Sequence, residues 1–212
     1  MTSKVLFYRL REKRTLKGIF SMEHSDEELV AKAKKNDRRA FEVLINRHEK
    51  MVFNLAYRML GNREDAEDAA QDSFIRLYHS IAKFRGQAKF TTWLYRIVSN
   101  VCLSKLSASA ARQNFVELDA ETEAIYSDVS DWKNTPENIL LKEESKQIVR
   151  ELVRLLPPAY RVVINLYHLE GSSYAEIAQI LGLPEGTVKT HLFRAREALK
   201  KAVLNKYQQG EI

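Results

Sequence analysis

The chain has 212 residues, one cysteine and a formal net charge of +6, from 34 Lys and Arg against 28 Asp and Glu. A single cysteine excludes a disulfide scaffold and a zinc site built on paired cysteines. The sequence contains no run of 18 apolar residues, so we expect no direct membrane insertion. Gly and Pro are scarce, at 7 and 4 residues, which argues against a turn-rich β fold. Segments rich in Ala, Leu, Glu, Lys and Arg favour helices, and we predict an all-α, cytoplasmic protein.

Composition divides the chain into two small helical domains, a tail and a linker. Residues 1–24 are basic and lack the features of a signal peptide, so they predict a disordered tail, with a transit peptide or surface anchor as alternatives. Residues 107–135 carry six acidic and two basic side chains without periodicity, which indicates a flexible acidic linker. The helical domains are then expected at 25–106 and 136–207.

Capping signals mark the helices of the first domain. Ser25 and Glu28 form a capping box, Gly61 is typical of a helix C-terminus, and Asn62 can cap the helix that follows. Residues 84–90 are expected to form a loop. Apolar spacing between these signals predicts four helices, at about 26–36, 41–60, 63–81 and 91–106.

The second domain contains a helix-turn-helix pattern. A helix is expected from Thr135-Pro136 to Pro157-Pro158, and another over about 159–170. Ser173 and Glu176 then form a second capping box, which opens a short helix that ends at Gly182. After a three-residue turn, a long basic helix runs to about Tyr207. A short helix, a tight glycine turn and a longer basic helix are typical of DNA-binding domains.

The last helix has a buried stripe that includes Val188 and Leu192, and a basic outer surface. Residues 186–206 hold six basic residues and one acid. Phe193 lies outside the apolar stripe, where it could contact a thymine methyl group. An ordinary amphipathic helix with a solvated basic face is the alternative, but the capping box and Gly182 favour DNA binding.

A second basic segment, residues 83–106, contains five Lys and Arg, no acid, and interleaved aromatic residues. Trp93, Arg96 and Asn100 are spaced to share one exposed stripe of a helix. These three side chains suit the binding of unstacked bases. The Trp ring can stack on a base, the Arg cation can contact phosphate, and the Asn amide can bond a base edge. The residues alone favour core aromatics beside a solvated helix face.

The helix over 63–81 carries an acidic stripe of Asp65, Asp68 and Asp72, bordered by Gln71 and Ile75. Three interpretations stay open, namely a solvated face, a carboxylate site for metal or acid–base chemistry, and a docking surface for a basic protein. The segment brings no His or Cys to this face, and the chain as a whole shows no catalytic motif. We therefore predict no enzyme activity, no cofactor and no metal.

Two segments are similar to a known family. The stretch GNREDAEDAAQDSFIRLYHSIAKF, followed by FTTWLYRIVSNV, resembles region 2 of bacterial sigma factors. The stretch LPPAYRVVINLYHLEGSSYAEIAQILGLPEGTVKTHLFRAREALKK resembles their region 4. The short intervening linker resembles that of the extracytoplasmic-function (ECF) group of the sigma-70 family.

The resemblance implies a promoter-specificity subunit that binds core RNA polymerase, through its largest and second-largest subunits, and promoter DNA. It also implies an anti-sigma factor as a partner, with a membrane anchor on that partner as an open alternative. The residues matching polymerase contacts are Asp68, Gln71, Asp72 and Tyr78. Those expected at the −10 element are Arg76, Ser80, Phe84, Trp93, Arg96, Ile97 and Asn100. Those expected at the −35 element are Lys189, Thr190, Phe193, Arg194 and Arg196. The two elements would lie about 16–17 base pairs apart, roughly 55 Å of duplex.

Two other functions compete with this interpretation. A transcription regulator of the response-regulator type also uses a T-V-K-T-H helix, but it needs a receiver domain with strands, and residues 23–106 lack the period-2 pattern of strands. A nucleic-acid enzyme is disfavoured because no catalytic constellation is present.

Overall fold

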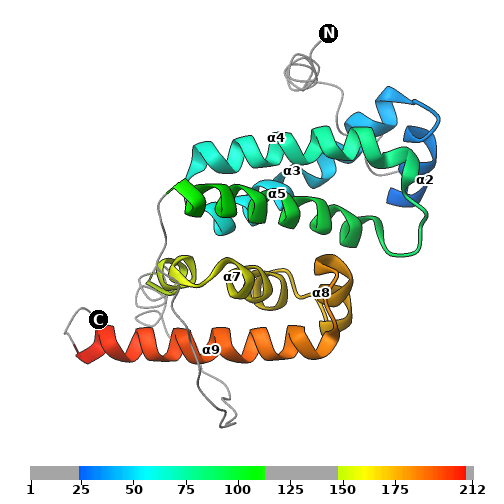
Figure 1. Cartoon of the computed structure of the whole chain (residues 1–212). Helices are drawn as coiled ribbons and strands as arrows, with labels where there is room; N and C mark the ends of the chain where they lie inside the picture. The colour runs from blue at the N-terminus through cyan, green and yellow to red at the C-terminus, as the bar shows by residue number, and fades with distance from the viewer. Residues whose placement is uncertain (1–23, 113–147, 209–212) are drawn as a thin grey trace, which may run out of the picture.

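The computed structural model describes residues 24–112 and 148–208, and in these two ranges the chain is helical without strands. Figure 1 shows two layers, with the first domain above the second. The upper layer contains α2 (Asp26–Ala33), α3 (Arg38–Leu60), α4 (Arg63–Ser80), the 3-10 turn η2 (Ile81–Lys83) and α5 (Phe90–Arg112). The lower layer contains helical residues 148–155, α7 (Pro158–Ile164), the π-helical turn η3 (Asn165–Leu169), α8 (Tyr174–Leu181) and α9 (Glu185–Gln208). The all-α prediction and its helix-turn-helix are confirmed.

The capping residues act as the sequence predicts. Ser25 accepts a hydrogen bond from the backbone of Glu28, whose side chain accepts one from the backbone of Ser25. Ser173 and Glu176 make the same reciprocal pair at α8. Gly61 ends α3 with φ +88°, a left-handed conformation that favours glycine. These capping interactions determine where the helices begin and end.

Apolar stripes of the four upper helices meet in one core. In α4, the apolar stripe of Ala66, Ala70, Phe74 and Leu77 is buried, and Phe74 at 2% exposure is its largest member. The α5 residues Leu94 and Val98 are fully buried against it. His48 also lies in this core, at 7% exposure. Buried residues of the lower helices, including Val163 and Leu166, belong to the same hydrophobic cluster.

Two predicted helix ends were wrong. The helix expected over 26–36 ends at Ala33, because Asn36 takes a left-handed φ of 65° and Asp37 already caps α3. The helix expected to end near Leu106 continues to Arg112, six residues into the predicted linker. Residues 107–112 are mostly Ser and Ala, and alanine propagates a helix even where apolar periodicity is lost.

Several predictions lie outside the described residues. They are the disordered tail over most of residues 1–24, the linker beyond Arg112, and the helix start at Thr135-Pro136.

A polar cluster connects α2 to α3 through hydrogen bonds. The Asp26 carboxylate accepts hydrogen bonds from Arg47, at 2.5 Å, and from Nε2 of His48, at 2.9 Å. Burial alone would raise the Asp26 pKa, but the hydrogen bonds from His48 and Arg47 outweigh burial and lower it overall.

This cluster predicts a loss of stability in acid. Because the folded-state pKa of Asp26 lies below its usual value of 3.8, its contribution is complete above that value and is lost as the pH falls through the folded-state pKa. Asp26→Asn should therefore cost roughly 1–2 kcal/mol of unfolding free energy at pH 7. Urea unfolding should show that this difference shrinks below about pH 4. A difference that is constant from pH 7 to pH 3 would contradict the assignment.

Candidate nucleic-acid interface

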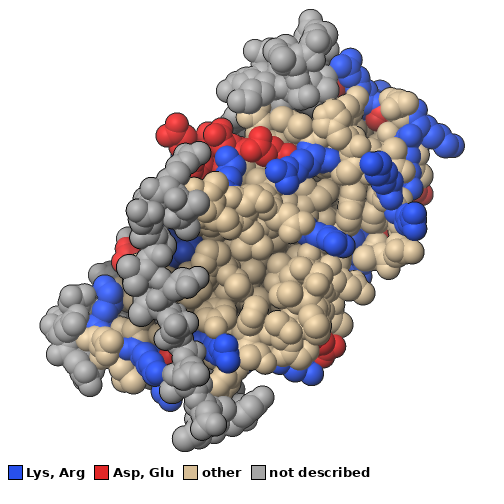
Figure 2. Space-filling view, viewed as in Figure 1, with Lys and Arg blue, Asp and Glu red and all other residues tan. Residues whose placement is uncertain are grey.

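The acidic face lies along α4. Asp68, Gln71, Asp72 and Tyr78 share one side of this helix, because their spacing returns each to the same face. Asp68 and Tyr78 are exposed, the latter at 43%, while Gln71 and Asp72 are half-buried. In Figure 2, acidic side chains gather at the upper edge of the molecule, over α4. The structure thus brings the predicted polymerase-contacting residues onto one surface.

Gln71 has an unusual environment within this face. Its Nε2 is buried and has no hydrogen-bond partner among residues 24–112 and 148–208. Asp72, one residue on, forms an ion pair of 3.7 Å with Lys105 of α5. An unsatisfied buried donor is uncommon in folded proteins.

Trp93 on α5 lies in an aromatic cluster. Its ring centroid is 4.9 Å from that of Phe84 and 6.2 Å from that of Phe90. Along the predicted stripe, Arg96 and Asn100 are exposed and Trp93 is half-buried. Ile97, on the same side of the helix, is also half-buried. The neighbouring rings hold Trp93 in place, so one face of an incoming base would meet a fixed aromatic surface.

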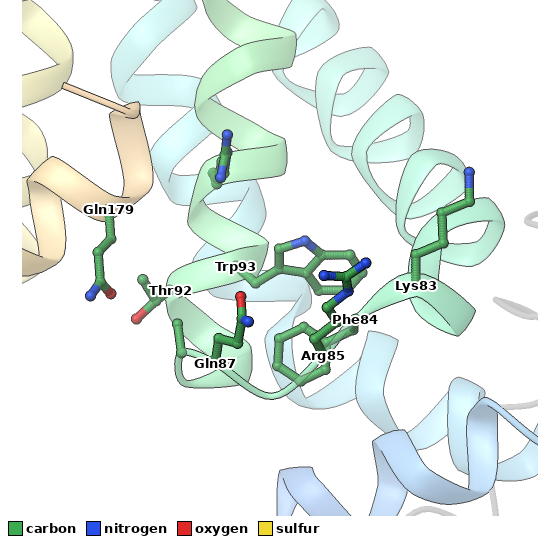
Figure 3. A pocket seen from close by; sticks show the side chains of 9 residues that line it. Lys83, Phe84, Arg85, Gln87, Thr92, Trp93 and Gln179 are labelled. Atoms are coloured by element: carbon green, nitrogen blue, oxygen red, sulfur yellow. The ribbon is translucent and has the colours of Figure 1, made fainter.

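A pocket of about 450 Å³ opens beside Trp93. Figure 3 shows that the loop residues Phe84 and Arg85 form one side, while Gln179 of α8 faces Thr92 from the other. Seven of the nine side chains around it are basic, aromatic or amide-bearing. Its lining is made of Lys83, Phe84, Arg85, Gln87, Ala88, Thr92, Trp93, Arg96 and Gln179.

Two predicted −10 residues lie on α4 rather than α5. Arg76 is exposed, whereas Ser80 is half-buried. The Ser80 hydroxyl donates to the backbone oxygen of Arg76 at 2.6 Å, so this proton is already used within the helix. Ser80 retains only its acceptor lone pairs for a ligand.

The helix-turn-helix is formed by α8 and α9. Gly182 links them with φ +67°, and the packing stripe of α9 is buried at Val188, Leu192 and Ala195. This packing leaves Lys189, Thr190 and Arg194 exposed, with Phe193 half-buried. The residues predicted at the −35 element therefore lie on the outer surface of one helix.

Neighbouring groups position these side chains. Lys189 forms a 3.0 Å ion pair with Glu185 and lies 5.5 Å above the ring centroid of Tyr174. The Thr190 hydroxyl donates to the Gly186 backbone oxygen at 2.9 Å. Burial, and then the charge of Arg194, lower the pKa of His191, so this imidazole adds no charge to the face at neutral pH.

Arg196 is held at the side of α9. Its Nε donates to Nε2 of His168 at 3.3 Å, and its guanidinium lies 5.3 Å from the ring centroid of Tyr167. Burial and the Arg196 charge both lower the pKa of His168, which keeps the imidazole neutral and able to accept. Arg196 is thus fixed in direction while it stays exposed to solvent.

Sequence reasoning missed a set of residues that join the two domains. Arg58 of α3 and Tyr95 of α5 both donate to the carboxylate of Glu170, which follows η3. Arg161 of α7 donates to the backbone oxygen of Met59 in the last turn of α3, at 2.5 Å. The partners are more than 70 positions apart in the chain, so local patterns carried no signal for them.

Other kinds of site were also considered within 24–112 and 148–208. There is no group of three or more His, Cys, Asp or Glu side chains placed to hold a metal in these ranges. The helices there are too short or too polar to cross a membrane.

Comparison with known proteins agrees with this architecture. The family model for Sigma-70 region 2 matches residues 44–112, and that for Sigma-70, region 4 matches residues 146–199. The ECF RNA polymerase sigma-E factor of Haemophilus influenzae is 37% identical over 182 residues, covering 84% of this chain and 95% of the relative. The RNA polymerase sigma-H factor of Pseudomonas aeruginosa is 33% identical over 183 residues, covering 85% and 95%. The solved structure of CnrH in complex with the cytosolic domain of CnrY has a TM-score of 0.58 at 25% identity, covering 85% of this chain and 97% of CnrH.

The two matched regions, in this order, define a sigma factor of the sigma-70 family. With the identities above, the chain belongs to the ECF group of that family. It is a promoter-specificity subunit of RNA polymerase. The response-regulator alternative fails, because residues 24–112 form a helical bundle where a receiver domain would need strands.

Proposed function

We propose that the chain acts in the cytoplasm as a non-catalytic subunit whose three surfaces have separate tasks. The outer face of α9 binds the −35 element in the major groove, with Lys189, Thr190, Phe193 and Arg194 near base edges and Arg196 on phosphate. The α5 stripe and the Phe84 loop hold the unpaired −10 strand. The observation that carries this proposal is the presence of both sites on one chain, a basic helix-turn-helix and a basic aromatic pocket.

The α4 face is proposed to bind core polymerase. Asp68 and Tyr78 are exposed there, beside the half-buried Gln71. A negative face of this kind suits a partner surface rich in Lys and Arg. Arg76 and Ser80, further around α4, are assigned with Ile97 to the border of the −10 site.

An anti-sigma factor is the other proposed partner. CnrH was solved with the cytosolic domain of CnrY bound, and the likeness of the present fold to CnrH supports a partner of the same class. Such a partner would need to cover one of the three surfaces to prevent transcription.

Transcription with purified components tests the function. The chain is added to core polymerase with a library of genomic templates, and the start sites are sequenced. We expect new transcripts whose promoters share two sequence elements, one near −35 and one near −10. The chain alone should show no tight, specific binding to duplex DNA. Specific duplex binding without polymerase, together with no promoter-directed transcript, would overturn the proposal.

A further inference from the structure

A histidine that the proposed function does not use lies beside the −35 face, between η3 and α9. His168 belongs to the π-helical turn η3, and its Nε2 accepts from Nε of Arg196 at 3.3 Å and from Nη2 at 3.2 Å. An arginine only donates, so Nε2 carries no proton and the ring proton lies on Nδ1. Two of the five guanidinium N–H groups are used in this contact, and three others remain for a ligand.

Two stacked tyrosine rings support the contact. The ring centroids of Tyr167 and Tyr174 are 5.1 Å apart, with an angle of 18° between the rings. Arg196 lies 5.3 Å from the Tyr167 centroid, and Lys189 lies 5.5 Å from the Tyr174 centroid. The rings of Tyr167 and His168 meet edge to face, with 4.9 Å between their centroids. The cation–π contact and the hydrogen bonds together limit the directions that Arg196 can take.

His168 shares the open side of the second domain with the cations assigned to DNA. Lys189 and Arg196 are seven positions apart, about two helical turns, and both are exposed, as is His168. Figure 1 shows α9 along the side of the second domain that faces away from the first. Because Nε2 of His168 lies 3.2 Å from Nη2 of Arg196, a phosphate bound at this edge of the guanidinium would also lie beside the imidazole.

The charges around His168 keep its ring neutral in the free chain. Arg196 of α9 faces the ring, while Glu170, two positions on, is ion-paired with the first domain. Glu176 of α8 is ion-paired with the loop before α5, and Arg161 of α7 donates to backbone oxygens. Burial, and then the Arg196 charge, lower the pKa of His168 from its usual value of 6.5, so the ring carries no charge at pH 7.

We propose that His168 and Arg196 form a phosphate site at the edge of the −35 face, in which His168 takes up a proton from solvent when DNA binds. This deepens the proposed function and rests on its assignment of Arg196 to phosphate. In the free chain, Nε2 of His168 accepts from Arg196 and holds it in place. In the complex, Nε2–H donates to a phosphate oxygen, and the guanidinium donates to the same phosphate.

Proton uptake sets the direction of the pH dependence. A phosphate beside the ring stabilises the imidazolium form, so the pKa of His168 is higher in the complex than in the free chain. The complex then binds more protons than the separate partners do. Affinity for the −35 duplex therefore rises as the pH falls through the range between the two pKa values, and this gain is lost as the pH rises again.

The test measures binding of holoenzyme to a labelled duplex that carries the −35 element and stops upstream of −10. Between pH 7.5 and 6.0, the affinity of the parent should rise roughly three- to fivefold more than that of His168→Gln, because one proton changes affinity by at most about tenfold per pH unit. The half-buried His191 is present in both chains, so its own titration cancels. Glutamine keeps a neutral acceptor for Arg196, so the two chains should bind equally at pH 7.5.

Two further variants define the role of the charge. His168→Lys carries a permanent cation, so it should bind at pH 7.5 about as tightly as the parent does at pH 6.0, with a flatter pH profile. His79→Gln changes an exposed histidine on α4 and should keep the parental profile. A role in folding alone would not make lysine tighter than histidine at pH 7.5.

Salt dependence gives a second readout. An added contact between a cation and phosphate releases about one more counterion, so the slope of log affinity against log salt should be steeper by about one at pH 6.0 than at pH 7.5 in the parent. The slope of His168→Gln should not change with pH. The gain in acid should be equal for duplexes with correct and altered −35 sequences, because phosphate carries no sequence information.

The outcomes separate this site from the proposed function. Equal pH profiles for the parent and His168→Gln, with −35 binding intact, would overturn the phosphate site and leave the proposed function standing. A gain confined to one −35 sequence would also overturn it, because His168 would then read a base. A holoenzyme that binds duplexes with and without a −35 element equally would overturn the proposed function, and the phosphate site with it.

Discussion

Charge reversal on the acidic face of α4 is expected to remove most of the affinity for core polymerase. In the variant Asp68→Arg with Gln71→Ala, a carboxylate becomes a cation and the orphaned amide is removed. A basic partner surface would then meet a like charge, which costs affinity and slows association. We expect core binding to weaken at least tenfold, about 1.4 kcal/mol.

Folding should survive this change, because Asp68 is exposed and Gln71 is only half-buried. The matched control is Glu151→Arg, which makes the same change of charge on an exposed residue of the second domain. Fluorescence anisotropy against core polymerase measures the affinity, and thermal unfolding checks the fold. Equal affinities for the parent, the control and the double variant would show that polymerase binds elsewhere.

The helix boundaries were predictable where short-range chemistry sets them. The capping boxes at Ser25 and Ser173, and the left-handed Gly61 and Gly182, each depend on residues within four positions. The buried stripe of α9 followed from helical spacing alone. These features placed the helix-turn-helix and its exposed basic face before any tertiary contact was known.

Contacts between distant residues were not predictable from such patterns. Trp93 has the spacing of an exposed residue, but Phe84 packs on it from a loop whose path the sequence does not define. Glu170 and Arg58 are 112 positions apart, and a lone acid beside a glycine gives no sign of burial. The family resemblance identified the three surfaces and gave no indication that one domain covers part of the other.

Substitutions at the two DNA sites should have different effects, one on melting and the other on duplex binding. Asn100 is exposed on the α5 stripe, so Asn100→Ala removes an amide from the proposed −10 site without disturbing the core. We expect holoenzyme carrying this variant to bind promoter duplex normally and to melt the −10 region poorly. Permanganate reactivity of unpaired thymines measures the melting, and Asn54→Ala on α3 is the exposed control.

Arg194→Ala should have the opposite effect. A side chain that contacts a base edge contributes about 1–3 kcal/mol, so binding to duplex with the −35 element should weaken roughly 5- to 150-fold. The loss should be largest for the correct −35 sequence, because a base contact discriminates and a phosphate contact does not. Arg150→Ala, an exposed arginine on helix 148–155, is the control for a simple loss of charge.

Both variants are needed, because the result expected for each one alone has a second explanation. A holoenzyme that fails to melt DNA could have bound it poorly, and the normal −35 binding expected for Asn100→Ala removes that explanation. Weak duplex binding by Arg194→Ala could reflect only the loss of a positive charge. The Arg150→Ala control tests this explanation, and so does the dependence of the loss on the −35 sequence. If Asn100→Ala melts promoters as well as the parent does, the α5 stripe does not hold the −10 strand. If Arg194→Ala weakens all duplexes equally, Arg194 contacts phosphate and the base contacts come from other residues of α9.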